Sequence, residues 1–324
     1  MTNSLSFTRR ALLGAAVAVS ALMGSAQAGE KYPSGPVSIV VPFSAGGTTD
    51  AIARLVAEEL QTRWGSAVVV ENKPGAGGVI ATQAVARAKP DGRQILFNDI
   101  GIALNEVTMP SRPYDLAKDL RPVVTVGEWP LAFLAGSSTG IKTMSDLIER
   151  AKTESLAFGT FGPASSPHLA AELLKSVAGI DLKIVHFKGV SPVIQAMASG
   201  EVQLGVFGAG AAAGEVAKGT MNLLALDYKS PLVPEAPTFA EAGVEGLRAI
   251  AWWGVFVQSE TPDEIVNEIN AAVNEALGSE RVVNYLDTNG YTSVGGEPAA
   301  LQQRVDEAIN LWGPLVEKAG IAAK

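Results

Sequence analysis

One stretch near the N-terminus, residues 37–50, constrains the fold more than any other part of the chain. It begins with the β-branched run Val37–Val41, which is typical of a strand buried on both faces of a parallel sheet. The glycine turn Gly46–Gly47 follows, and then Thr48–Asp50, whose hydroxyl and carboxylate groups can cap a helix. Apolar residues then recur at helical spacing, at Ile52, Leu55, Val56 and Leu60. The stretch therefore predicts a strand, a tight loop and a helix, which is the unit of an α/β fold.

The predicted helix start has two interpretations. Its first backbone N–H groups have no partner within the helix and carry the positive end of the helix dipole, which favours a bound anion. An ordinary turn between a strand and a helix would use glycines in the same way. Asp50 is equally ambiguous, because its carboxylate can cap the helix, order the loop or accept a hydrogen bond from a ligand. The local pattern leaves both interpretations open.

Composition narrows the class of protein. The chain has 324 residues, 47% of them hydrophobic, with 34 glycines and 18 prolines, which fits a compact α/β protein of two domains. Its net charge of −8 argues against nucleic acid or an anionic membrane surface as a partner. There is no cysteine, and His168 and His186 are the two histidines, so we expect neither a metal site nor a cofactor.

The first 28 residues have the pattern of an export signal. Arg9–Arg10 precede the apolar run Ala11–Met23, and Ala26–Ala28 supplies small residues before a cleavage point. The run is too short for a comfortable membrane span, and the arginine pair is typical of a twin-arginine signal. Cleavage after Ala28 removes two basic residues and no acid, which takes the net charge from −8 to −10. We expect a periplasmic protein, exported by the general or the twin-arginine route.

The order of strand, glycine-containing loop and helix recurs along the chain. Since open parallel sheets bind ligands at the carboxyl ends of their strands, this recurrence is the strongest functional signal that the residues carry by themselves. The loops are expected at residues 71–78, 159–167, 188–191 and 208–210. Three further elements are expected elsewhere. Residues 98–105 are predicted to form a polar loop at a strand end, and residues 123–126 and 131–134 are predicted to form two strands around Gly127. The proline-rich segment 234–243 is predicted to contain a turn and a short helix.

A serine hydrolase is the enzymatic alternative, because Ser165, Ser166 and His168 are near neighbours in the sequence. A catalytic triad requires a base that approaches the hydroxyl in a defined geometry and is itself oriented by an acid, and sequence neighbours rarely meet this requirement. The sequence around Ser165 also lacks the Gly-x-Ser-x-Gly elbow of α/β-hydrolases. We therefore interpret His168 as a residue of the first helical turn that bonds locally, and we expect no enzyme.

Short motifs along the whole mature chain resemble those of one family in residue type and order. Together they resemble the Bug family of periplasmic solute-binding proteins, also called the receptor components of tripartite tricarboxylate transporters. The motifs are Tyr32–Pro33, Val40–Asp50, Val70–Gly78, Ala88–Gly92, His186–Gly189, Ala236–Gly243, Trp252–Phe256 and Trp312.

The resemblance implies a type II periplasmic-binding-protein fold, α/β in class, with two doubly wound domains joined by crossing strands. We expect domain 1 to comprise residues 29–127 and 249–324, and domain 2 to comprise residues 128–248. In the family a ligand carboxylate is held largely by backbone N–H groups, hydroxyls and bridging waters, which avoids a buried cation. The ligand-binding residues that the resemblance implies are Phe43, Ser44, Ala45, Gly46, Gly47, Thr48, Asp50, Gly77, Gly159, Thr160, Phe161, Ala164, Ser165, Ser166, His168, Lys188, Gly189, Phe207 and Gly208.

The implied function is a monomeric receptor that closes on a small carboxylate and delivers it to the membrane subunits of a tripartite transporter. One departure bears on the ligand: many relatives have Asp or Asn after the strand that ends at Phe207, where this chain has Gly208–Gly210. With Phe43 and Phe161 expected nearby, we favour an aromatic or aliphatic mono- or dicarboxylate over an amino acid or citrate. A sensor that docks on a membrane histidine kinase would use the same pocket and stays open as a second class.

Overall fold

The structure, a computed structural model, describes residues 32–162, 165–187, 189–248 and 250–321. The predicted export signal at residues 1–28 lies outside the described residues, as do the predicted site residues Ala164 and Lys188. Within the described ranges, no helix combines the length and the apolar character that crossing a membrane requires.

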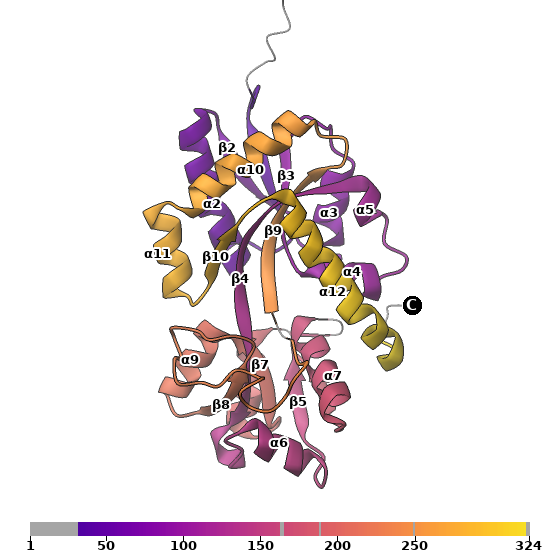
Figure 1. The fold of residues 1–324 in the computed structure, drawn as a ribbon, viewed down its shortest axis with the longest axis vertical. Helices are drawn as coiled ribbons and strands as arrows, with labels where there is room; N and C mark the ends of the chain where they lie inside the picture. The colour runs from indigo at the N-terminus through magenta and orange to yellow at the C-terminus, as the bar shows by residue number, and fades with distance from the viewer. Residues whose placement is uncertain (1–31, 163–164, 188, 249, 322–324) are drawn as a thin grey trace, which may run out of the picture.

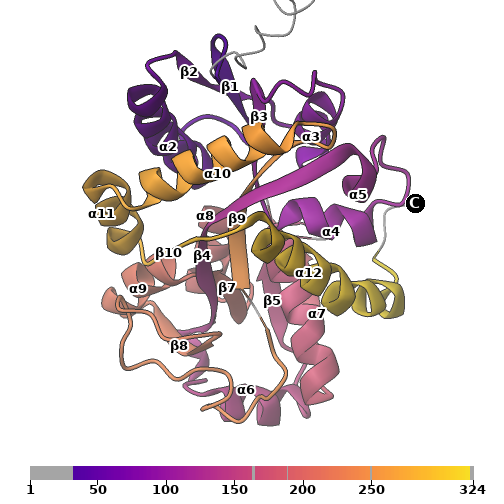
Figure 2. The same cartoon turned by 45° about the horizontal axis from the view of Figure 1, so that its top comes forward.

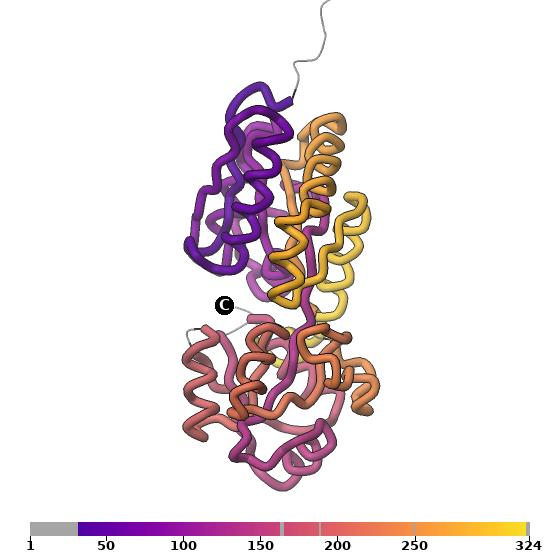
Figure 3. Tube along the Cα trace, turned by 90° about the vertical axis from the view of Figure 1, so that its left-hand side faces the viewer, coloured from indigo at the N-terminus to yellow at the C-terminus, as the bar shows by residue number. Residues whose placement is uncertain are grey.

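The strands form two groups that share a central strand, and Figures 1 and 3 show these groups as two lobes, one above the other. In the first lobe the strand order is β2-β1-β3-β9, with the first three strands parallel and β9 antiparallel to β3. In the second lobe the order is β7-β5-β6, and all three strands are parallel. The strand bounds are β1 (Val37–Val41), β2 (Val68–Asn72), β3 (Gln94–Asp99), β5 (Ala157–Thr160), β6 (Lys183–His186), β7 (Leu204–Gly208), β8 (Met221–Leu226), β9 (Ile250–Gln258) and β10 (Thr292–Gly295).

The shared strand, β4 (Leu120–Gly136), is continuous over 17 residues. Its first part pairs antiparallel with β9 and β10, and its last part pairs antiparallel with β7 and β8. The prediction of two strands around Gly127 is wrong. No turn interrupts the strand at this glycine, whose missing side chain instead lets a neighbouring strand approach closely. A Cβ at Gly127 would lie 2.8 Å from the carbonyl oxygen of Thr292 on β10, a strand that was not predicted.

Helices cover both faces of the first sheet. Successive side chains of a strand point to opposite faces, so apolar residues on both faces need a covering layer. Val40 and Leu96 face one side with the apolar residues of α3, α4 and α12, while Ile39 and Phe97 face the other side with those of α2, α10 and α11. Figures 1 and 2 show α12 running beside α4, and α10 running beside α2. The bounds are α2 (Thr48–Trp64), α3 (Val79–Ala86), α4 (Gly101–Thr108), α5 (Leu116–Asp119), α10 (Asp263–Leu277), α11 (Glu280–Thr288) and α12 (Pro298–Ala319).

The second sheet is covered in the same way. Phe158 and Val206 pack with residues of α6 and α7, and Phe207 and Leu134 pack with residues of α8 and α9 on the opposite face. The short helical turns η1 and η2 link strands to helices. The bounds are α6 (Met144–Ala151), α7 (Ser166–Ala178), α8 (Val190–Ser199), α9 (Ala209–Ala217), η1 (Ala76–Gly78) and η2 (Ser137–Thr139).

Three local predictions need correction. Residues 98–105 are not a loop, because α4 begins at Gly101, where burial of Ile102 and Leu104 and a 2.8 Å hydrogen bond from Gly101 N to the Asp99 carboxylate stabilise a helix. Residues 208–210 likewise enter a helix, α9. Residues 234–243 form turns and no helix, because the backbone of Phe239 bonds to Leu226 beside β8.

Candidate functional site

A cleft of about 590 Å³ lies between the two lobes, and residues of both lobes and of the strands β4 and β9 that connect them line it. Its described lining contains neither lysine nor arginine, and Asp99 is the one charged side chain in that described lining. The cleft therefore differs from an anion site built on basic side chains.

The first side of the cleft is the loop between β1 and α2, and Asp50 holds this loop in shape. The Asp50 carboxylate accepts hydrogen bonds from Gly46 N at 2.9 Å, from the Arg54 guanidinium at 2.9 and 3.0 Å, and from Asn72 Nδ2 at 2.9 Å. Asn72 also donates to the carbonyl oxygen of Phe43 at 3.0 Å. With 3% of its surface exposed, Asp50 is fully occupied in ordering the loop.

The protonation of Asp50 follows from these contacts. Burial by itself would raise the pKa of Asp50, but the hydrogen bonds from Arg54, Gly46 and Asn72 outweigh it and lower the pKa from 3.8 to about 2. Asp50 is therefore ionised at neutral pH, and its negative charge is compensated inside the loop.

The second side is the segment between β5 and α7. Ser165 is the N-cap residue of α7, and its hydroxyl donates to the carbonyl oxygen of Gly162 at 2.8 Å and not to the helix. Ser165, Ser166 and Pro167 line the cleft. Phe161 lies against Phe207 with the ring planes 16° apart. The segment thus presents one helix start and one aromatic ring to the cleft.

Five helices of the described chain begin at this cleft. Thr48 begins α2, Gly101 begins α4, Ser166 begins α7, Val190 begins α8, and Gly210 lies in the first turn of α9, and all five residues line the cavity. Each start presents backbone N–H groups without intrahelical partners and the positive end of a helix dipole. The convergence of these starts gives the cleft a field that favours an anion without a basic side chain.

An aromatic wall closes the cleft on the side of the connecting strands. Trp129 on β4 and Trp253 on β9 have ring centroids 3.8 Å apart, and Tyr291 meets Trp253 edge to face at 5.1 Å. The indole Nε1 of Trp253 donates to Thr49 Oγ1 at 3.0 Å, which ties the wall to the first turn of α2. This wall was not predicted as part of the site.

His168 lies behind the start of α7 and not in the cleft. It is 4% exposed, packs edge to face on His186 with ring centroids 4.9 Å apart, and has Nε2 3.8 Å from Glu172 Oε1. Burial, assisted by His186, lowers the pKa of His168. Because the Ser165 hydroxyl donates to Gly162, the geometry gives no support to a serine–histidine pair.

A second pattern of hydrolase type can also be set aside. Gly136–Gly140 has the spacing Gly-x-Ser-x-Gly, but Ser138 is exposed on the short turn η2, and α6 starts only at Met144, so the serine is not held at a sharp turn directly into an α-helix. Among the described residues, no group of three or more acidic or histidine side chains is arranged to hold a metal ion.

The structure brings part of the predicted site together. Ser44–Gly47 are exposed in the first loop, Gly189 precedes α8, and Asp50, Gly159, Thr160, His168 and Phe207 are buried behind the surface of the cleft. Direct contact of any of these residues with a ligand stays a prediction. The predicted residues that line the cleft are Phe43, Thr48, Gly77, Phe161, Ser165, Ser166 and Gly208.

Other lining residues were missed. The rule that ligands meet strand ends could have found Asp99 at the carboxyl end of β3, Leu104 and Asn105 on α4, and Met109 directly after α4. No local signal marks Tyr291, which reaches the cleft only through the packing of distant segments. The remaining lining residues are Thr49, Gly101, Trp129, Leu131, Pro167, Val190, Gly210, Ala211, Ala251 and Trp253.

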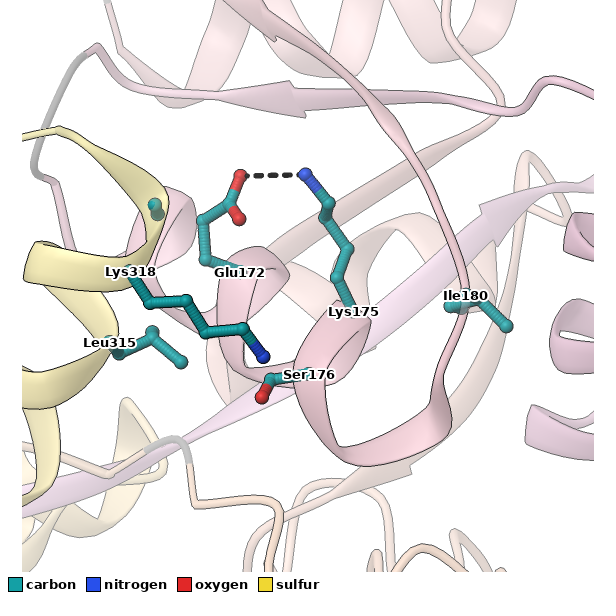
Figure 4. A pocket seen from close by; sticks show the side chains of 7 residues that line it. Glu172, Lys175, Ser176, Ile180, Leu315 and Lys318 are labelled. Carbon is teal, nitrogen blue, oxygen red and sulfur yellow. Dashed lines mark hydrogen bonds and ion pairs between the residues drawn. The ribbon is translucent and has the colours of Figure 1, made fainter.

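Figure 4 shows a further cavity, of about 330 Å³, where α12 of the first lobe meets α7 of the second. Lys175 donates to Glu172 at 3.1 Å, and Lys318 and Leu315 approach from α12. Its described lining contains no strand residue, and its charged side chains, Glu172, Lys175 and Lys318, belong to α7 and α12. This cavity lies at the contact between α7 and α12, outside the cleft, and is not the candidate site.

Comparison with known proteins gives a consistent picture. Residues 52–321 match the tripartite tricarboxylate transporter family receptor. The protein BugT of Bordetella pertussis is 31% identical to this chain, and the match covers 97% of this chain and 98% of BugT.

Two solved structures from Rhodopseudomonas palustris are similar along most of the chain. Rpa4515 with adipate is 33% identical with a TM-score of 0.78, and the match covers 90% of this chain and 99% of that one. MatC with bound malate is 31% identical with a TM-score of 0.75, and the match covers 88% of this chain and 100% of that one. The predicted type II periplasmic-binding-protein fold is confirmed.

Proposed function

Because the chain belongs to the tripartite tricarboxylate transporter receptor family, also called the Bug family, we propose that it captures a small carboxylate in the cleft between its lobes. The ligand is a mono- or dicarboxylate, and the receptor delivers it to the membrane subunits of a tripartite transporter. The family consists of solute-binding receptors and not of enzymes, so the protein binds its ligand without turnover.

The observation that carries this proposal is the convergence of five described helix starts on a cleft whose described lining has no basic side chain. An anion held by several neutral N–H and hydroxyl donors gains charge-assisted hydrogen bonds without the desolvation of a buried cation. The similar structures with adipate and with malate hold ligands of the proposed class.

The location and the motion belong to the same proposal. The leader pattern at residues 1–28 supports export to the periplasm by the general or the twin-arginine route. Domain 1, residues 29–127 and 249–324, and domain 2, residues 128–248, close on the ligand about the strands that connect them. Closure would trap the carboxylate and create the form that the membrane subunits recognise.

A thermal-shift screen of small carboxylates tests the proposal. A ligand that binds only the folded receptor raises its stability by about 2.7 kcal/mol when its concentration is about one hundred times Kd. We expect a clear rise in Tm with at least one carboxylate, and no rise with neutral sugars or with simple amines. A rise with sugars or simple amines and with no carboxylate would contradict the proposal.

Gly210 should be required for a tight cleft. An alanine here would place its Cβ 2.8 Å from the backbone carbonyl oxygen of Asn289, a contact between α9 of the second lobe and the end of α11 in the first. We expect Gly210→Ala to weaken binding of the carboxylate found in the screen by about tenfold, because the overpacked lobes must move apart. Isothermal titration calorimetry measures the change.

Gly214→Ala is the matched control. Gly214 lies on the same helix, and a Cβ there meets nothing within 4 Å. Alanine at this position should leave ligand affinity unchanged and stabilise α9 by up to about 1 kcal/mol. Equal affinities for the two variants would show that the approach of α9 to Asn289 has no part in binding.

A further inference from the structure

Asp99 is a carboxylate in the wall of a cleft proposed to bind carboxylates. It is the last residue of β3, where it pairs with Trp253 of β9, and it lines the cleft beside the start of α4. The acidic group therefore lies next to the aromatic wall, on the first lobe.

The contacts of Asp99 do not neutralise it. Its carboxylate accepts a hydrogen bond from the backbone N–H of Gly101 at 2.8 Å, and no described lysine or arginine forms an ion pair with it. Burial raises the pKa of Asp99 to about 6, so the group is ionised at neutral pH at an energetic cost. A bound group of suitable chemistry can reduce that cost.

A purely structural role for Asp99 would be to cap α4, and this role needs an acceptor oxygen but no charge. Asparagine retains that oxygen. The charge of Asp99 has another consequence, because it repels a second carboxylate on the ligand and attracts an ammonium or hydroxyl group. The two roles can therefore be separated by an isosteric substitution.

We propose that Asp99 determines ligand specificity by selecting carboxylates that carry a hydrogen-bond donor, an ammonium or a hydroxyl group, on the end that reaches the first lobe. This inference rests on the proposed carboxylate receptor and narrows its ligand class. The ligand carboxylate lies at the helix starts of α2 and α7, and its donor group meets Asp99.

The inference revises the preference drawn from the sequence. Gly208–Gly210 lacks the Asp or Asn side chain that many relatives have on the second lobe at this position, and this absence disfavoured amino acids. Asp99 supplies such an acceptor from the first lobe instead.

The test uses matched ligands of two lengths at about pH 7.5, where Asp99 is ionised. Succinate, 4-hydroxybutyrate and 4-aminobutyrate form one series, and adipate, 6-hydroxyhexanoate and 6-aminohexanoate form the other. Calorimetry gives Kd for the wild type, for Asp99→Asn and for Asp181→Asn. Asp181 is a suitable control because its side chain is 92% exposed on the surface, so the variant changes the net charge equally without touching the cleft.

We expect the wild type to bind the amino or hydroxy member of a series at least about tenfold more tightly than the dicarboxylate. Asp99→Asn should reduce this preference by about tenfold or more, weakening the amino ligand and strengthening the dicarboxylate. Asp181→Asn should keep the wild-type ranking. If Asp99→Asn fails to fold, Asp99→Ser, which also retains a capping oxygen, should show the same loss of preference.

Two outcomes would overturn the inference, and they are distinguishable. Tighter binding of the dicarboxylate by the wild type, or a ranking unchanged in folded Asp99→Asn, would refute the role of Asp99 and leave the carboxylate receptor intact. Absence of binding by all six compounds to every variant would refute the receptor proposal and this inference together.

Discussion

Replacement of Trp253 by alanine should destabilise the receptor by about 3 to 5 kcal/mol, the range for removal of a large buried aromatic side chain. The indole is 2% exposed, packs against Trp129 with ring centroids 3.8 Å apart, and donates to Thr49 Oγ1 at 3.0 Å. Its removal leaves a void that opens into the cleft and a buried hydroxyl without its partner. Urea denaturation, extrapolated to water, measures the loss of unfolding free energy.

Trp253→Phe separates packing from the hydrogen bond. Phenylalanine retains an aromatic ring beside Trp129 and Tyr291 but cannot donate to Thr49, so we expect a smaller loss, about 1 to 2 kcal/mol. Ligand affinity should fall in both variants, because Thr49 belongs to the first turn of α2 at the cleft. A loss of unfolding free energy below about 1 kcal/mol for Trp253→Ala would contradict the view that Trp253 ties the aromatic wall to α2.

Replacement of Asp50 by asparagine should destabilise the receptor by about 2.5 kcal/mol at neutral pH, the equivalent of lowering its pKa from 3.8 to about 2 on folding. The sign follows from the lower pKa in the folded state. Ionised Asp50 contributes its full stabilisation above about pH 4, this contribution falls as the pH drops towards about 2, and none remains below. The difference in unfolding free energy between the wild type and Asp50→Asn, measured by urea denaturation, should therefore become smaller from pH 7 to pH 3.

Glu154→Gln provides the control for Asp50→Asn. Arg150 and Glu154 also form a pair four residues apart, at 2.7 Å, but their side chains are 37% and 51% exposed, against 4% for Asp50. Water screens such a pair, so its loss should change stability by less than about 1 kcal/mol at either pH. A gap for Asp50→Asn that stays constant from pH 7 to pH 3 would rule out ionisation as the source of its effect.

The parts of the fold that the sequence predicts are those set by local chemistry. The strand, glycine loop and helix over residues 37–64 follow from β-branched residues, a glycine turn and apolar spacing, and the structure confirms them as β1 and α2. Asp50 lies in the first turn of α2, and its role in ordering the loop before that helix, one of the roles that the sequence left open, depends on neighbours four residues away on either side, Gly46 and Arg54.

The parts that the sequence does not predict depend on contacts between distant residues. Gly127 has the appearance of a turn residue, and only the approach of Thr292 shows that its missing side chain makes room for another strand. Asn98–Asn105 has the composition of a loop, but burial of Ile102 and Leu104 stabilises a helix. Asp99 was overlooked for the same reason, since a residue in a polar loop is expected to face solvent.

The aromatic wall shows the limit most clearly. Trp129, Trp253 and Tyr291 are separated by more than one hundred residues or by several elements, and each alone is an ordinary aromatic residue in a strand or turn. The contact of Trp253 with Trp129 could not be identified without the pairing of β4 with β9.

The continuity of β4 also constrains the order in which a newly made chain can fold. The strand has emerged by Gly136, but its first-lobe partner is β9, and β9 also completes the edge of β3, with Leu96 opposite Phe256. Neither pairing can form until the chain has been made past Gln258. Such long-range pairings slow folding, because a large loop must close before its contacts stabilise it. The sheet of the first lobe therefore stays incomplete for most of the synthesis of the chain, because the strand that joins β3 to β4 lies in the last third of the sequence.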